Sequence, residues 1–112
     1  MDAATVESLA PDAASVVAAR KLLRPALWSA TGRDARAVWG RCRDYNVAVD
    51  LDGPAYTCSC PSRKVPCKHA LALLLLEPAE GERPAWVSAW LEGRGRRRKR
   101  EPVRDLEAAA KR

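Results

Sequence analysis

Apolar and polar residues alternate most regularly in the middle of the chain, where every second residue between positions 45 and 51 is apolar. Such a period of two places the apolar side chains on one face of an extended strand. Residues 37–42 and 55–58 are also typical of strands, and short turns separate the three segments. The pattern therefore predicts a small antiparallel meander. The alternating apolar residues are Tyr45, Val47, Val49 and Leu51.

Apolar residues with helical spacing occur before this meander. Pro11 is well suited to the start of a helix, and an apolar face follows up to about residue 23. Residues 25–32, bounded by Pro25 and Gly32, are expected to form a loop or a short helix. The predicted apolar face of the first helix comprises Val16, Ala19, Leu22 and Leu23.

Two further helices are predicted after the meander. The first runs from about Cys67 to Glu77, and its residues 70–76 are apolar on all sides, so we expect it to be buried between other elements. The second begins at Pro84 and carries a Trp-rich apolar stripe at i, i+1, i+4 and i+5, which is more typical of a core than of an interface. The stripe consists of Trp86, Val87, Trp90 and Leu91.

The predicted fold class is α+β: a small antiparallel β-meander followed by a helix, with flanking N- and C-terminal helices. The expected organisation is a flexible lead-in at 1–10, one domain at 11–93 and a basic extension at 94–112. A chain of 112 residues buries a modest core, for which a metal ion is a common means of stabilisation.

The net charge of +6 is concentrated in one short segment. Apart from six basic residues between positions 94 and 100, the chain has equal numbers of basic and acidic residues. The basic segment is therefore a candidate for contact with phosphates, although such segments are often merely solvated. Its basic residues are Arg94, Arg96, Arg97, Arg98, Lys99 and Arg100.

Composition also bears on the location of the protein. No apolar run approaches the roughly 18 residues that span a bilayer, and the first residues lack the pattern of a secretory signal. We therefore expect a cytoplasmic protein with reduced cysteines rather than two disulfides. Abundant Ala and Arg with no Ile are typical of a GC-rich bacterial genome.

The strongest chemical signal is a cluster of three cysteines and the chain's single histidine within 12 residues. Zinc prefers four Cys and His ligands in a tetrahedron, and the spacing Cys-x-Cys, six residues, Cys-x-His allows one pair to follow a strand and the other to begin a helix. We therefore predict one structural zinc ion, so that the meander and the helix after it form a zinc-stabilised, ββα-like finger. The alternative is a set of incidental thiols. The predicted ligands are Cys58, Cys60, Cys67 and His69.

Basic residues lie beside these ligands. Arg63, Lys64 and Lys68 offset the negative charge of three thiolates, and with the helix N-terminus they favour the thiolate form that binds metal. The same three side chains are candidates for contact with nucleic acid. Charge compensation at the site is the alternative explanation.

The Cys58-x-Cys60-x6-Cys67-x-His69 pattern resembles the SWIM-type zinc finger, in particular its bacterial single-domain kind, over about Val47 to Leu76. The resemblance implies a short sheet followed by a helix, with zinc held between them. It also implies DNA binding or protein–protein interaction. No helicase, transposase or kinase domain accompanies the motif, so none of the activities of larger SWIM proteins is implied.

An enzymatic role is not expected, because four protein ligands leave no open position on zinc and the only histidine is one of them. Asp50 and Asp52 flank a turn at Gly53, where Asp is common for local hydrogen bonding. Cys42 lies outside the motif and is interpreted as a small buried residue, with a further ligand, a redox thiol or an inter-chain link as alternatives.

Two functions remain open after these considerations. The first is binding of DNA or RNA through backbone phosphates with little sequence preference, because the apolar helix after Cys67 lacks side chains that read bases. The second is a protein–protein interaction adaptor within a larger complex, anchored by Trp86 and Trp90. A membrane partner or a small-molecule substrate is not expected.

Overall fold

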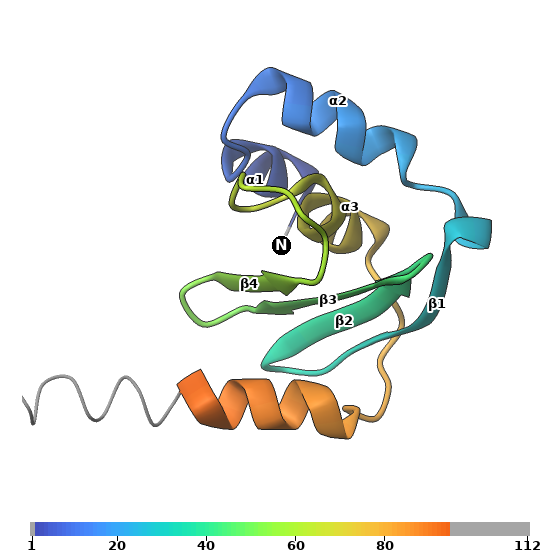
Figure 1. Ribbon diagram of the computed structural model, residues 1–112, viewed down its shortest axis with the longest axis vertical. Helices are drawn as coiled ribbons and strands as arrows, with labels where there is room; N and C mark the ends of the chain where they lie inside the picture. The colour runs from blue at the N-terminus through green and yellow to red at the C-terminus, as the bar shows by residue number, and fades with distance from the viewer. Residues whose placement is uncertain (1, 95–112) are drawn as a thin grey trace, which may run out of the picture.

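A four-stranded antiparallel sheet forms the centre of the computed structural model, which describes residues 2–94. Its strand order follows the chain, β1-β2-β3-β4, and helices cover both faces (Figure 1). Each strand is therefore a direct neighbour of the next, joined by a short connection. The strands are β1 (Trp28–Arg33), β2 (Ala37–Cys42), β3 (Tyr45–Asp50) and β4 (Ala55–Cys58).

The strands β2, β3 and β4 confirm the meander predicted from alternation. Val38 faces Val49 across β2 and β3, and Val47 faces Cys58 across β3 and β4. The prediction omitted β1, because residues 25–32 were expected to form a loop or a short helix. A short 3-10 helix does occupy Pro25–Leu27, but the chain then enters the sheet directly.

The strand β1 lacks the regular alternation of a typical strand. Its pairing with β2 is irregular between Ser29 and Gly32, and Ala30 adopts a positive φ of 50°. Gly32 is required by close packing, since a Cβ there would lie 2.7 Å from Nε1 of Trp39. These features explain why the sequence pattern did not indicate a strand.

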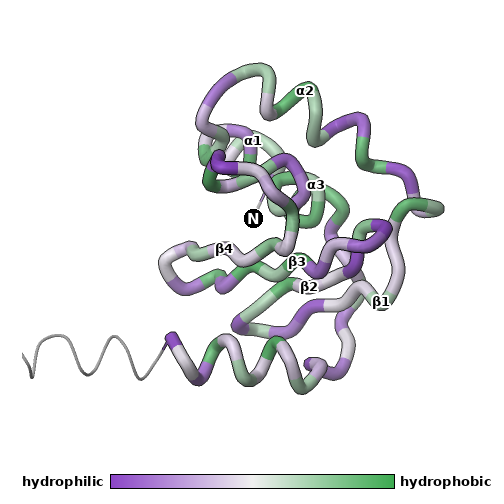
Figure 2. The backbone as a smooth tube through the Cα atoms, viewed as in Figure 1, coloured by the Kyte–Doolittle hydropathy of each residue, from purple (hydrophilic) through white to green (hydrophobic). Residues whose placement is uncertain are grey.

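The helix α3 (Lys68–Leu76) lies on one face of the sheet and forms the centre of the larger core. Residues 69–74 are all buried, as the uniformly apolar run predicted. Figure 2 shows this apolar segment between the sheet and the N-terminal helices. The predicted burial of this helix between other elements is confirmed.

The helices α1 (Ala3–Ser8) and α2 (Ala13–Lys21) cover α3 on the side away from the sheet (Figure 1). Asp2 and Asp12 cap them, accepting hydrogen bonds from the amides of Thr5 and Ser15. An ion pair between Arg20 and Glu7 joins the two helices.

The N-terminal helices differ from two sequence-based expectations. Residues 1–10 were expected to be a flexible lead-in, yet α1 is capped and its Val6 is fully buried in the core. In α2 Ser15 is buried in addition to the predicted Ala19, and the predicted Leu22 packs against the core from the C-cap, whereas Leu23 is exposed. Leu23 lies beyond the end of α2, so helical spacing no longer places it on the buried face.

Residues 85–94 form a helix on the opposite face of the sheet. Val87 and Leu91 are buried there in a second small core with residues of β2 and β3. Trp90 packs at its edge, and Trp86 is 39% exposed. The expected Trp-rich stripe is therefore only partly core. Among residues 2–94, no helix is both long enough and apolar enough to cross a membrane.

Candidate metal centre

The sheet and α3 bring the four predicted ligands together. Cys58 is the last residue of β4, Cys60 follows in the connecting loop, Cys67 is the N-cap of α3 and His69 lies in the first turn of α3. One ligand atom from each residue lies within 4.8 Å of all the others. Zn–S bonds of about 2.3 Å in a tetrahedron place two sulfurs about 3.8 Å apart, so the group fits one zinc ion.

The state of His69 supports this assignment. The side chain is 6% exposed, and its Nδ1 is buried with no hydrogen-bond partner within the described residues. A buried ring nitrogen without a partner is costly unless it binds a metal. The ring of Tyr45 packs against that of His69 with centroids 5.1 Å apart and restricts its orientation. The four residues thus form the site of one structural zinc ion.

The cysteines of the cluster influence one another electrostatically. A hydrogen bond from the Cys58 thiol lowers the pKa of Cys67, against the opposing effect of burial. The same interaction, together with burial, raises the pKa of Cys58. The site therefore already favours a thiolate at Cys67, and a divalent cation would favour thiolates at its neighbours too.

The loop between the two ligand pairs is attached to the rest of the fold. Asn46 in β3 exchanges hydrogen bonds with Ser59, whose amide donates to the Asn46 carbonyl at 3.2 Å. At the other end, Lys64 pairs with Asp12 at 2.7 Å, which lowers the pKa of Asp12 to about 2. The loop is thus linked both to the sheet and to the N-cap of α2.

The fourth cysteine is separate from the metal group. Cys42 is 1% exposed at the end of β2, and burial raises the pKa of its thiol. It is not among the residues that could share the ion. Its interpretation as a small buried residue agrees with this placement.

The predicted nucleic-acid contacts divide into residues without an ion pair among residues 2–94, residues held by an ion pair, and residues outside the described part of the chain. Arg63 and Lys68 are exposed and form no ion pair with the described residues, whereas Lys64 is held by Asp12. Arg94 was predicted to begin the basic extension, but it is part of the folded domain, because its Nε donates a hydrogen bond to buried Asp50 at 2.8 Å. This partner lies 44 residues earlier, so local charge could not reveal it. Outside the described residues lie Arg96, Arg97, Arg98, Lys99 and Arg100.

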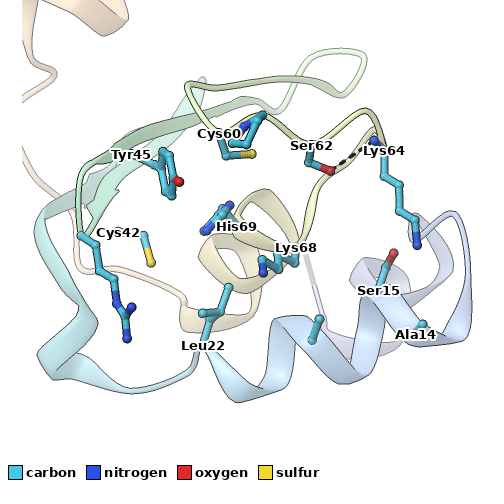
Figure 3. A pocket seen from close by; sticks show the side chains of 13 residues that line it. Ala14, Ser15, Leu22, Cys42, Tyr45, Cys60, Ser62, Lys64, Lys68 and His69 are labelled. Atoms are coloured by element: carbon cyan, nitrogen blue, oxygen red, sulfur yellow. Dashed lines mark hydrogen bonds between the residues drawn. The ribbon is translucent and has the colours of Figure 1, made fainter.

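A groove of about 650 Å³ lies between α2 and the zinc loop (Figure 3). Three basic residues line it, and no Asp or Glu does. One of them, Arg43, lies in the turn between β2 and β3 and was not among the predicted contacts; within residues 2–94 its guanidinium has no ion-pair partner. The other two are Lys64 and Lys68.

Residues 45–77 match the family model of the SWIM zinc finger, which covers β3, β4, the metal group and α3. This agrees with the resemblance inferred from the Cys and His spacing, and this segment is a SWIM zinc finger. No curated protein and no solved structure matches the chain. The remaining elements, including α1, α2 and β1, lie outside the matched segment.

Proposed function

We propose that this chain, which carries a SWIM zinc finger at residues 45–77, is a nucleic-acid-binding module that contacts backbone phosphates with little sequence preference. Its zinc has a structural role, because it joins the end of β4 to the start of α3. The thiolates that such a site requires favour a reducing, cytoplasmic location.

The convergence of basic residues from three segments carries the proposal. Arg43 comes from the β2–β3 turn, Lys64 from the zinc loop and Lys68 from the first turn of α3, yet all three line one groove. No acidic residue lines this groove, although Asp12 pairs with Lys64 at its margin. A surface of this kind attracts an anionic polymer and releases its counterions.

The burial of α3 supports a low sequence preference. Of its residues, His69 to Leu74 are buried, and Lys68 is the exposed basic residue at its start. A helix that reads bases must instead present polar side chains along an exposed face in the major groove. Phosphate contacts position a protein without reading sequence.

We also propose that the chain is not an enzyme. Four protein side chains are grouped at the metal site, and a zinc ion held by all four has no open position for water or substrate. A chelator-sensitive hydrolytic activity of the zinc-loaded protein on DNA or RNA would contradict this part of the proposal.

The test is a binding titration of the zinc-loaded chain with DNA and RNA at several salt concentrations, using the chain truncated after Arg94 in parallel. We expect an affinity that falls as salt rises, and residual binding by the truncated chain, because the groove cations remain. Failure of the full-length chain to bind DNA or RNA at low salt would contradict the proposal.

A role as a protein-interaction adaptor is the second candidate. It is favoured by Trp86, a large apolar side chain that remains 39% exposed on the helix of residues 85–94. Trp is enriched among residues that dominate binding energies. If this role is the main one, Trp86→Ala abolishes capture of a protein partner while binding of nucleic acid is unchanged.

A further inference from the structure

We propose that the groove between α2 and the zinc loop receives unpaired nucleotides, so that the module prefers single-stranded nucleic acid to a duplex. This inference rests on the proposed function and specifies its substrate. It follows from the combination of apolar side chains in the groove with two cations, Arg43 and Lys68, that have no ion-pair partner within residues 2–94.

Phosphate binding alone does not explain why apolar side chains line the groove. Ala14 and Ala18 of α2 form one side together with Leu22, the C-cap of that helix, and Pro61 and Tyr45 lie on the other. Figure 3 shows Tyr45 and Cys60 across the groove from Ala14, Ser15 and Leu22. A duplex presents its phosphates outward and keeps its bases stacked inside, so the faces of its bases cannot pack against these apolar side chains.

A single strand provides the matching chemistry. Its bases can leave the stack and pack against aromatic and apolar side chains, while its phosphates contact Arg or Lys nearby. Tyr45 is half-buried, so part of its ring remains accessible beside the groove. Ser62 also lines the groove, and its exposed side chain offers a hydroxyl group to base edges.

The charges around the groove favour a polyanion. Arg43 and Lys68 have no ion-pair partner among residues 2–94, so both are available for phosphates. Lys64 contributes less, because Asp12 holds it at 2.7 Å. The volume of about 650 Å³ lies in the range of roughly 300–1,000 Å³ that accepts a small ligand such as a nucleotide. An acidic peptide is the competing occupant.

The test compares fluorescent oligothymidine of about 15 nucleotides with a duplex of equal length, both binding the full zinc-loaded chain. Ala14→Glu places a negative charge in the groove. Its matched control is Val17→Glu, on the same helix, where Val17 is 54% exposed and does not line the groove. We expect Ala14→Glu to weaken binding of the single strand about tenfold more than Val17→Glu does.

A second pair of variants tests the cations. Arg43→Gln is compared with Arg24→Gln, an exposed arginine that does not line the groove. We expect a several-fold loss of single-strand affinity for Arg43→Gln and little change for Arg24→Gln. Zinc content and tryptophan fluorescence equal to those of the wild-type chain confirm that each variant is folded.

The outcomes separate this inference from the proposed function. Equal binding of both nucleic acids, with Ala14→Glu no worse than Val17→Glu, overturns the groove assignment and leaves phosphate binding intact. No binding of any nucleic acid overturns both. Binding of a polyglutamate peptide that Ala14→Glu abolishes, without single-strand binding, assigns the groove to an acidic protein partner instead and also overturns the inference.

Discussion

Cys67 connects the metal site to α3, the helix at the centre of the larger core. It is both a grouped ligand and the N-cap of α3, and it is 6% exposed. We expect Cys67→Ser to release zinc and to lower the free energy of unfolding by more than about 3 kcal/mol, because a Ser hydroxyl does not replace the thiolate. Zinc analysis and thermal unfolding by circular dichroism measure both effects.

The control for that variant is Cys42→Ala. Cys42 is also buried, but it lies outside the metal group. This variant should retain one zinc per chain despite a modest loss of stability. Retention of zinc by Cys67→Ser, or loss of zinc by Cys42→Ala, would mean that the ligand set has been assigned incorrectly.

Asp50 is a fully buried carboxylate that holds two arginines. It accepts hydrogen bonds from Arg36 at 2.8 and 3.1 Å and from Arg94 at 2.8 Å. Burial opposes its ionisation, yet these hydrogen bonds hold the pKa of Asp50 well below its usual range. Asp50→Asn should cost about 3–5 kcal/mol in the free energy of unfolding, because two guanidinium groups lose their shared anion.

The pH dependence of this effect has a defined sign. A carboxylate whose folded-state pKa is lowered contributes stability that is complete above the unfolded pKa of about 4 and is lost as the pH falls below it. Urea unfolding should therefore show a constant difference between the wild-type chain and Asp50→Asn from pH 6 to 8. A difference that changes within this window would contradict the assigned role of Asp50.

The roles of individual residues could be predicted where their interaction partners lie close in sequence. The four metal ligands span 12 residues, and their spacing sufficed to identify them. Asp50 was expected only to make local turn bonds; it does accept one from the Asp52 amide, but its arginine partners come from other segments. Long-range pairs of this kind leave no periodic signal in a sequence.

Among the elements, the helix of residues 85–94 is attached through a small contact surface. Val87 and Leu91 are its buried residues, and Arg94 adds the pair with Asp50. Leu91→Ala should lower the free energy of unfolding by about 2–4 kcal/mol, measured by urea denaturation. The matched control Trp86→Ala, at an exposed position of the same helix, should cost less than about 1 kcal/mol. Equal losses would place Trp86 in the core.

Elements with a regular pattern were predicted, and those defined by tertiary contacts were missed. Alternation in β3 and the apolar run of α3 identified both elements to within a residue or two. β1 escaped detection because its bulge and its small residues disturb alternation. α1 escaped because its one buried residue, Val6, gives no helical stripe. The sheet and the core helix supply the partners that stabilise both.

At the scale of the whole molecule, the folded part extends at least to Arg94. Truncation after Arg94 should leave the melting temperature nearly unchanged, because the described contacts all remain. Truncation after Gly93 removes Arg94 and should lower the free energy of unfolding by about 1–3 kcal/mol. The two truncated chains differ only in Arg94, so a comparison of their thermal unfolding measures the contribution of this residue to stability. Identical curves would show that the Arg94–Asp50 pair has no structural role.

The molecule as a whole combines two cores on opposite faces of one sheet, with the metal group at the point where β4 passes into α3. A small domain of this kind depends on its metal to hold the sheet against the core helix. Loss of zinc should therefore disrupt packing well beyond the four ligands.

The most direct test of this account is a chelator titration in which zinc release and tryptophan fluorescence are followed on the same sample. We predict one zinc per chain and a loss of tertiary structure that coincides with its release, reversed when zinc is restored. A chain that keeps its tertiary structure after complete removal of zinc, or that contains no zinc when folded, would contradict the central claim.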